Sequence, residues 1–426
     1  MKYTQNDRIE QLTEKTLIVG VDIASQVHYA RAFDYRGIEH GKTLKFDNNQ
    51  SGFKALRDWI DGLCSEFGKN HVIVGMEPTG HYWFSLAWFV LDNDMELVVV
   101  NPFHVKRFKE LDDNNPTKND RKDPKTIAML IKDGRYATPY LPKGVYGELR
   151  VAMGSRRRIV KQLNDVKNRI KRWLSIYFPE FCSVFASWEG KTALATLQKY
   201  PLPAQLLELG IEEIAQYWKD VGIKRVGIKK ATVLHETAKD SVGTSQGLKS
   251  ASEELAFLLE EYALLKSQEQ KILSLVEELL HEIPASQELL KIKGIGLVTV
   301  AGLLSEVGDI TRFASPKQIQ KYAGLNLKEN SSGKHKGRTT ISKRGRRELR
   351  ALLFRGVMPL VATNDEFKEL HKYYTTRSVN RLTKLQSLVA LMCKLIRIFF
   401  AILTKNVAYD GQKMLQDIQR PTLQAA

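Results

Sequence analysis

The sequence predicts an α/β domain followed by a long all-α region. From residue 15 to about residue 145, short apolar runs rich in β-branched residues alternate with helical patterns. Beyond that point apolar residues recur at alternating four- and three-residue steps, which is typical of long packed helices. The chain has 426 residues, of which 43% are hydrophobic and 9% aromatic, enough for two or three domains with real cores.

The first domain is expected at residues 1–145. Its expected strands lie at 16–23, 27–33, 42–46, 71–76 and 96–100, and its helices lie near 50–66, 81–93 and 123–133. The first three strands follow one another closely, as in hairpins, whereas helices separate the later ones, which indicates a mixed sheet flanked by helices. This order is that of an RNase H-like fold, whose active-site acids typically lie on the first strand, the fourth strand and a late helix.

Four carboxylates occupy those positions. Asp22 follows an apolar strand, Glu77 follows another, and Asp120 and Asp123 open a helix on one helical face. A buried charge is costly unless it is paired or bound to a metal, and carboxylate oxygens are the ligands that Mg²⁺ prefers. The set therefore predicts a Mg²⁺ site. Asp123 precedes Pro124, so by itself it could also be a helix N-cap followed by proline at the first helical position.

A helical region is expected at residues 146–283, with an insertion at about 179–245 that the sequence does not assign. Two helices in this region carry heptad-like apolar seams, which suggests a coiled coil formed either as an antiparallel hairpin or between subunits. The first seam consists of Ile159, Leu163, Val166, Ile170, Trp173 and Tyr177. The second consists of Leu255, Leu258, Tyr262, Leu265, Ile272, Val276 and Leu279, with Glu269 interrupting it.

The first seam helix also has a basic outer face. Asp165 is the acid opposed there to a run of cations that includes Arg156, Arg157, Arg158 and Lys161. Such a run can be merely a solvated face, but the surplus of cations favours contact with a nucleic-acid backbone. A formal net charge of +17 supports the same class of partner.

A third domain is expected at residues 284–426. Lys293, Gly294 and Gly296 precede an apolar helix in the style of a helix–hairpin–helix element, in which glycines let helix-start N–H groups approach phosphates. The alternative is a glycine turn between packed helices. A polar loop follows, in which Ser331 and Ser332 lie among cations. Such surroundings suit a hydroxyl nucleophile that attacks a phosphodiester. The alternative is an ordinary loop that contacts phosphate. The basic residues of this loop and the following helix are Lys334, Lys336, Arg338, Lys343, Arg346 and Arg347.

Other classes of protein fit the sequence poorly. Cys64, Cys182 and Cys393 are odd in number and far apart, which argues against a disulfide framework and suits a reducing cytoplasm. The first residues lack a signal-peptide pattern, and Lys394 and Arg397 interrupt the most apolar stretch, 388–403, so no membrane association is expected. We expect a cytoplasmic, nucleoid-associated protein.

Several motifs together resemble the DEDD-type insertion-sequence transposases, the one-ten family. They are Gly20-Val21-Asp22, Gly75-Met76-Glu77-Pro78-Thr79-Gly80, Asn101-Pro102, Lys118 to Asp123, Ile292 to Gly296, Tyr322-Ala323-Gly324-Leu325, Ser332-Gly333 and Ile341-Ser342-Lys343-Arg344-Gly345. The resemblance covers nearly the whole chain. It implies a RuvC-like first domain, a coiled-coil segment and a C-terminal transposase domain with a catalytic serine.

The resemblance also implies roles. Asp22, Glu77, Asp120 and Asp123 match the family's metal-binding tetrad; the Ser-Gly dipeptide favours Ser332 as nucleophile, whereas ungapped spacing from Gly337 and Lys343 favours Ser331. The expected activity is Mg²⁺-dependent transposition through a covalent serine–DNA intermediate, on donor and target double-stranded DNA and, as in some members, with a structured guide RNA.

A homo-oligomer, dimer or tetramer, is expected because strand exchange holds two duplexes at once. Two rival functions remain open at this stage. One is a metal-dependent junction endonuclease that uses water as its nucleophile. The other is a non-catalytic nucleic-acid-binding protein whose acids are structural.

Overall fold

The computed structural model describes residues 4–112, 123–224, 226–328, 331–332, 335–336 and 339–419. The chain forms two compact units, Met1–Leu141 and Pro142–Ala426, called unit 1 and unit 2 below. The sequence led us to expect boundaries at residues 145 and 283. The first boundary lies close to the division between the units, whereas residues on both sides of position 283 share one hydrophobic core within unit 2.

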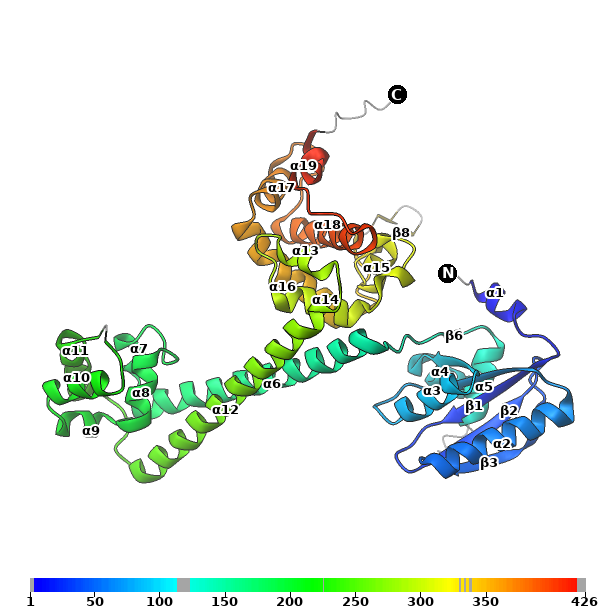
Figure 1. The fold of residues 1–426 in the computed structure, drawn as a ribbon, viewed down its shortest axis with the longest axis horizontal. Helices are drawn as coiled ribbons and strands as arrows, with labels where there is room; N and C mark the ends of the chain where they lie inside the picture. The colour runs from blue at the N-terminus through cyan, green and yellow to red at the C-terminus, as the bar shows by residue number, and fades with distance from the viewer. Residues whose placement is uncertain are drawn as a thin grey trace. The chain divides into compact units, whose positions relative to one another are not determined.

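Unit 1 is built on a six-stranded mixed sheet with the strand order β3-β2-β1-β4-β5-β6 (Figure 1). β1, β2 and β3 pair antiparallel, β4 and β5 continue parallel to β1, and β6 pairs antiparallel with β5. The strands are β1 (Thr16–Asp22), β2 (Val27–Phe33), β3 (Glu39–Asp47), β4 (His71–Met76), β5 (Glu96–Val100) and β6 (Tyr136–Ala137). The α/β class and the mixed sheet expected from the sequence are therefore present.

Helices cover both faces of this sheet. α2 (Gln50–Phe67) and α3 (Trp83–Asp92) share one core with β1, whereas α5 (Asp123–Lys132) shares the other. Because both faces are covered, β1 is buried along its length and reads as a continuous apolar run rather than an alternating one. The sequence located these strands and helices within a few residues. It missed α1 (Gln5–Glu10), α4 (Pro102–Asp112) and β6.

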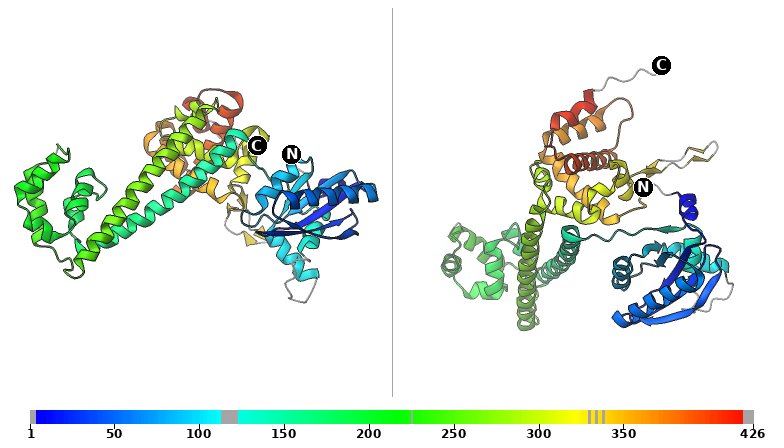
Figure 2. Two further views of the ribbon diagram at one scale, coloured as in Figure 1. Left: turned by 60° about the horizontal axis from the view of Figure 1, so that its bottom comes forward. Right: turned by 45° about the vertical axis from the view of Figure 1, so that its right-hand side comes forward.

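Two long helices form the spine of unit 2. α6 (Gly144–Tyr177) and α12 (Leu248–His281) lie side by side and antiparallel (Figures 1 and 2). The early part of α12 shares a core with the late part of α6, and its last turns share another with the start of α6. The seams therefore meet within one chain, as the hairpin alternative stated. Glu269, the polar interruption, accepts a hydrogen bond from Arg156 of α6 at 2.8 Å.

The unassigned insertion forms a bundle of short helices at one end of this spine (Figure 1). Its helices are α7 (Phe181–Val184), α8 (Lys191–Lys199), α9 (Pro203–Glu208), α10 (Ile211–Asp220) and α11 (Ile228–Lys239). Trp218 is fully buried and donates its indole N–H to Thr196, while Trp173 of α6 donates to the Ala251 carbonyl of α12. These buried aromatics give the insertion a core continuous with the spine.

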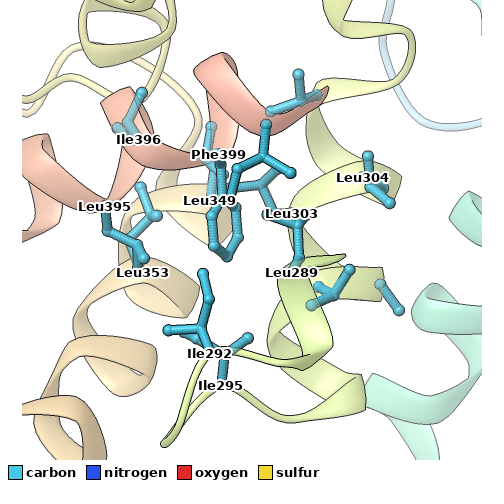
Figure 3. Packing of buried hydrophobic residues seen from close by; sticks show 14 of the residues in the cluster. Leu289, Ile292, Ile295, Leu303, Leu304, Leu349, Leu353, Leu395, Ile396 and Phe399 are labelled. Atoms are coloured by element: carbon cyan, nitrogen blue, oxygen red, sulfur yellow. The ribbon is translucent and has the colours of Figure 1, made fainter. Parts of the chain in front are cut away.

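The remaining helices pack around the other end of α12. Figure 3 shows the core that they share, where Leu289, Leu303, Leu349 and Phe399 meet. The helices are α13 (Ser286–Leu290), α14 (Leu297–Val307), α15 (Pro316–Tyr322), α16 (Arg347–Thr363), α17 (Asp365–Thr376), α18 (Lys384–Lys405) and α19 (Gly411–Gln419), with a 3₁₀ turn at Ile310–Arg312.

α18 is the one described helix that is long and apolar enough to cross a membrane, judged by length and composition alone. Leu391, Leu395 and Phe399 on its inner face are fully buried in the core of unit 2. The core helix of a folded domain passes the same test, and α18 packs as one.

Candidate active site and nucleic-acid contacts

The sheet register places Asp22 and Glu77 next to each other. Val21 of β1 pairs with Met76 of β4, and each acid is the next residue along its strand direction. Neighbouring strands lie about 4.8 Å apart, so both acids leave the same edge of the sheet as neighbours. Both residues are half-buried.

Two glycines let α5 approach this edge. Gly20 pairs with Gly75; a Cβ on Gly20 would lie 2.0 Å from the Pro124 carbonyl oxygen, and one on Gly75 would lie 2.1 Å from Ile131 Cδ1. Side chains alternate along a strand, so Asp22 lies on the same face as Gly20, the face against which the first turn of α5 packs. Asp123, half-buried, begins that helix.

Asp22 on β1, Glu77 directly after β4 and Asp123 on α5 thus come from three neighbouring segments at the carboxyl edge of β1 and β4. Within the ranges that the structure describes, no three His, Cys, Asp or Glu side chains are grouped closely enough to hold a metal ion. Asp120, the fourth acid of the predicted tetrad, lies outside the described residues.

His28 holds the turn that follows Asp22, although no sequence pattern singles it out. It is fully buried on β2, and its Nδ1 accepts a hydrogen bond from the Ala24 N–H at 3.2 Å. Burial lowers the pKa of His28 below its usual value of 6.5, which favours the neutral ring that can accept this bond. A histidine in a strand carries no sequence signal for this role.

In unit 2 the serines lie on a short β-ribbon. β7 (Leu327–Lys328) pairs with β10 (Thr340–Ile341), and β8 (Ser331–Ser332) pairs with β9 (His335–Lys336). Ser331 is opposite Lys336 and Ser332 is opposite His335 in the backbone register. Lys334 and Arg338 lie outside the described residues.

The motifs at 322–325 and 341–345 pack against each other at the base of this ribbon. A Cβ on Gly345 would lie 2.4 Å from the Tyr322 carbonyl oxygen, and Gly324 has a φ of +72°. Arg350 of α16 donates to the carbonyls of Ala323 at 3.0 Å and Lys343 at 3.2 Å. Arg350 is one of the basic residues that the sequence places on the helix after the serine loop, and these two bonds make it a positioning residue for the backbone of both motifs.

The glycine turn at 293–296 connects α13 to α14. Gly294 has a φ of +93°, and a Cβ there would lie 2.7 Å from Thr363 Oγ1, so packing against α16 explains this glycine. Gly296 caps α14 with open space around it, so packing does not explain it. Lys293 is exposed beside the turn.

The basic face of α6 is partly neutralised from other elements. Arg156 is half-buried and pairs with Glu269 of α12, and Arg157 pairs with Glu348 of α16 at 3.1 Å. These acids are distant in sequence, so the charge balance along α6 alone does not reveal them. Arg158 and Lys161 are exposed.

A cavity of about 400 Å³ joins two of the predicted basic clusters between α6, α14 and α16. Arg346, which pairs with Glu306 at 2.8 Å, lines it together with cations of α6. Its basic lining residues are Arg150, Arg156, Arg157, Lys161, Arg346 and Arg355. Lys343 and Arg347 are exposed near the start of α16.

Two stretches of the chain match family models of transposases. Residues 19–179 match the DEDD-type IS110 family model described as a transposase, and residues 286–372 match the model described as the IS116/IS110/IS902 transposase family. The chain is 25% identical over 401 residues to a pilin gene-inverting protein of Moraxella bovis, covering 92% of this chain and 97% of that protein.

An uncharacterised protein of insertion element IS110 from Streptomyces coelicolor is 21% identical over 400 residues, covering 93% of this chain and 96% of that protein. A transposase of insertion element IS1111A from Coxiella burnetii is 30% identical over 123 residues, or 29% of this chain and 34% of that protein. The two matched regions carry the strand-end acids and the motifs at 322–325 and 341–345 respectively. The chain belongs to the IS110 family of insertion-sequence transposases.

Proposed function

We propose that this transposase excises and inserts its element by Mg²⁺-dependent transesterification through a covalent serine–DNA intermediate. The observation that carries the proposal is the meeting of Asp22, Glu77 and the first turn of α5 at one sheet edge, over the Gly20–Gly75 pair. The strand order, with three antiparallel strands followed by two parallel ones, is compatible with an RNase H-like, RuvC-like domain.

The acids present suit Mg²⁺ in their chemistry. Mg²⁺ is usually held by one or two carboxylates together with waters and substrate phosphate oxygens, so a closed group of three protein ligands is not required. Asp22 and Glu77 would be the first ligands, with Asp123 and Asp120 beside them. When bound, the ion would neutralise charge on the scissile phosphate.

The serine supplies the nucleophile in this proposal. The oxygen of Ser332, or of Ser331, forms a bond to phosphorus while one phosphorus–oxygen bond of the DNA backbone breaks. The serine proton ends on the DNA hydroxyl that is released. A DNA hydroxyl of a second strand then reverses the step, so bond energy is conserved and no nucleotide triphosphate is consumed.

The test is a denaturing gel of the purified chain incubated with labelled element-end DNA. We expect a Mg²⁺-dependent protein–DNA adduct that is abolished by Ser332→Ala, whereas Ser331→Ala retains it; the reverse pattern would make Ser331 the nucleophile. Asp22→Asn and Glu77→Gln should lower adduct formation at least about 100-fold, because electrostatic stabilisation of phosphoryl transfer is then lost.

Cleaved DNA without an adduct would instead support the junction-endonuclease function, in which water is the nucleophile. Specific binding with neither product would support the purely binding function.

We also propose that a structured RNA guides target choice. The exposed cations Arg158 and Lys161 of α6 and Lys343 and Arg347 near the ribbon support contacts with a polyanion. Sequencing of RNA that copurifies with the chain tests this, and we expect one species transcribed beside the reading frame. A background of unrelated cellular RNAs would contradict it.

A further inference from the structure

Three large aromatic side chains are exposed beside the acids of unit 1. Tyr82, Phe84 and Phe103 retain 41%, 45% and 61% of their accessible surface. Tyr82 and Phe84 follow β4 and Glu77, and Phe103 follows β5. Because β4 and β5 are parallel neighbours, both segments leave the sheet at the edge from which Asp22 and Glu77 emerge.

Packing does not explain these three rings. Trp83, between Tyr82 and Phe84, is 9% exposed and belongs to the core, and Val105, two residues after Phe103, is 2% exposed. Each helix therefore has its own core anchor. The neighbouring rings stay about half exposed, even though the Phe84 ring stacks on Trp83 with 4.5 Å between the ring centres. Leaving apolar surface of this size exposed is unfavourable, and exposed aromatic rings along one edge of a sheet are typical of a binding surface.

Cationic groups accompany the rings. The Arg107 guanidinium lies 5.6 Å from the centre of the Phe103 ring, and Lys106 beside it is exposed. The His81 and Tyr82 rings lie 4.2 Å apart. Aromatic faces interleaved with cations are the combination that binds single-stranded nucleic acid, in which bases stack and phosphates pair with lysine and arginine.

We propose that this aromatic edge, Tyr82, Phe84 and Phe103, stacks on unpaired nucleobases of the strand processed at the neighbouring acids. The inference rests on the proposed function in that DNA strands are cleaved and exchanged there. A paired duplex hides its base faces, whereas an opened strand presents them, so the aromatic edge selects the opened strand. The shared chemistry is the unpaired base, on DNA or on RNA.

The experiment measures the affinity of the full-length chain in EDTA, so that no cleavage occurs. Fluorescence anisotropy is recorded with a labelled single-stranded thymidine 20-mer, the matching uridine 20-mer and a fully paired 20-base-pair duplex. The triple variant Tyr82→Ala, Phe84→Ala and Phe103→Ala should weaken binding of a single strand at least about fivefold, since one stacked base contributes about 1–3 kcal/mol. Duplex affinity should stay within about twofold.

Weaker binding of only the DNA strand or only the RNA strand identifies the source of the base and supports the proposal. If the triple variant binds both single strands and the duplex equally more weakly, the proposal is wrong. It is also wrong if the affinity for neither single strand changes, which is the result expected if this surface binds a protein instead.

A matched control lies at the opposite edge of the same sheet. Tyr35 is 40% exposed after the end of β2, and the Arg36 guanidinium lies 5.6 Å from its ring. Tyr35→Ala should leave every affinity unchanged. Phe103→Leu keeps an apolar side chain but removes the aromatic face, so it should weaken single-strand binding without affecting the duplex, as the triple variant does. Unchanged thermal unfolding of Phe103→Leu and of the triple variant verifies the fold.

The result is separable from the test of the proposed function. If the wild type forms no adduct but the triple variant binds single strands more weakly, the proposed chemistry is contradicted and the aromatic edge is supported. If the wild type forms the adduct but the triple variant binds single strands as well as the wild type does, the proposed chemistry is supported and the aromatic edge is contradicted.

Discussion

Gly20 lies where the backbone of α5 leaves no room for a side chain. Gly20→Ala would place a methyl group against the Pro124 carbonyl, 2.0 Å away, and α5 would have to move. We expect a loss of about 1–3 kcal/mol in the free energy of unfolding of unit 1, as for overpacking in a core, together with loss of adduct formation. Urea unfolding followed by circular dichroism measures the first effect.

Gly62 is the control for this substitution. It lies on the exposed side of α2, and a Cβ there would have no heavy atom within 4 Å. Gly62→Ala should stabilise unit 1 by about 0.5–1 kcal/mol through helix propensity. Equal effects of the two substitutions would contradict the close approach of α5 to β1.

The two glycines of the turn before α14 should respond differently to alanine. Gly294→Ala puts a side chain at a φ of +93° and 2.7 Å from Thr363 Oγ1, so it should cost about 1–2 kcal/mol in unfolding free energy. Gly296→Ala meets open space and should leave stability nearly unchanged.

DNA affinity separates the alternatives for this turn. If α14 receives a phosphate at its start, Gly296→Ala should weaken duplex binding several-fold, measured by anisotropy at fixed salt. Unchanged affinity would favour a turn that serves packing alone.

Glu189 links the helical insertion to both long helices of unit 2. Its carboxylate accepts a hydrogen bond from the Tyr262 hydroxyl of α12 at 2.9 Å and pairs with Lys167 of α6 at 2.7 Å. Burial raises the pKa of Glu189, but the bonds from Lys167 and Tyr262 outweigh burial and hold it below the usual 4.5. Burial and Glu189 raise the pKa of Tyr262 to about 12, so it remains a donor.

Tyr262→Phe should therefore destabilise unit 2 by about 1.5–3 kcal/mol, the usual contribution of a hydrogen bond to a charged group. Because the folded-state pKa of Glu189 is depressed, its contribution is complete above pH 4.5 and is lost as the pH falls through the lower, folded-state value. Thermal unfolding at pH 7 and across the acid range measures both effects.

Glu261 gives the matched control, since it joins the same two helices through an exposed pair with Arg169. Glu261→Gln should change stability by no more than about 1 kcal/mol. A larger loss than that of Tyr262→Phe would contradict the role given to Glu189.

Strand and helix positions in unit 1 were predictable because covered strands give β-branched runs and the helices between them give apolar periodicity. α4 was not predicted, since its low apolar content makes it resemble a loop in sequence. The ribbon bearing Ser331 and Ser332 was also missed: its strands are two residues long, too short for any alternation to be visible.

The candidate site was predictable only in part for a related reason. Asp22 and Glu77 come at the ends of apolar strands and stand out in the sequence. The roles of His28, which accepts one backbone N–H, and of Arg350, which donates to two backbone carbonyls, depend on how the chain folds and have no sequence pattern. The seam residues were located correctly, and they pack against each other within one chain. The expected homo-oligomer stays a prediction.

For the whole molecule, the charge of +17 predicts DNA binding that weakens steeply with salt. Arg158→Gln with Lys161→Gln should lower the slope of log affinity against log salt by about 0.9 for each phosphate that is no longer neutralised. Arg156→Gln should change stability more than the slope, because Arg156 is half-buried and paired with Glu269. Duplex titrations at four salt concentrations measure both slopes.

An unchanged slope in the double variant would remove α6 from the DNA-contacting surface. A reduced slope in Arg156→Gln equal to that of the double variant would show that the ion pair with Glu269 opens on binding.

The facing glycines of β1 and β4 have a consequence for protein engineering. Because Gly20 and Gly75 have no side chains, α5 can pack close to β1 and β4. If Asp22, Glu77 and Asp123 were grafted onto another sheet without these two glycines, the helix would be held away from the sheet and Asp123 would lie farther from the other two acids. A design that transfers the carboxylates must therefore also transfer the two glycines.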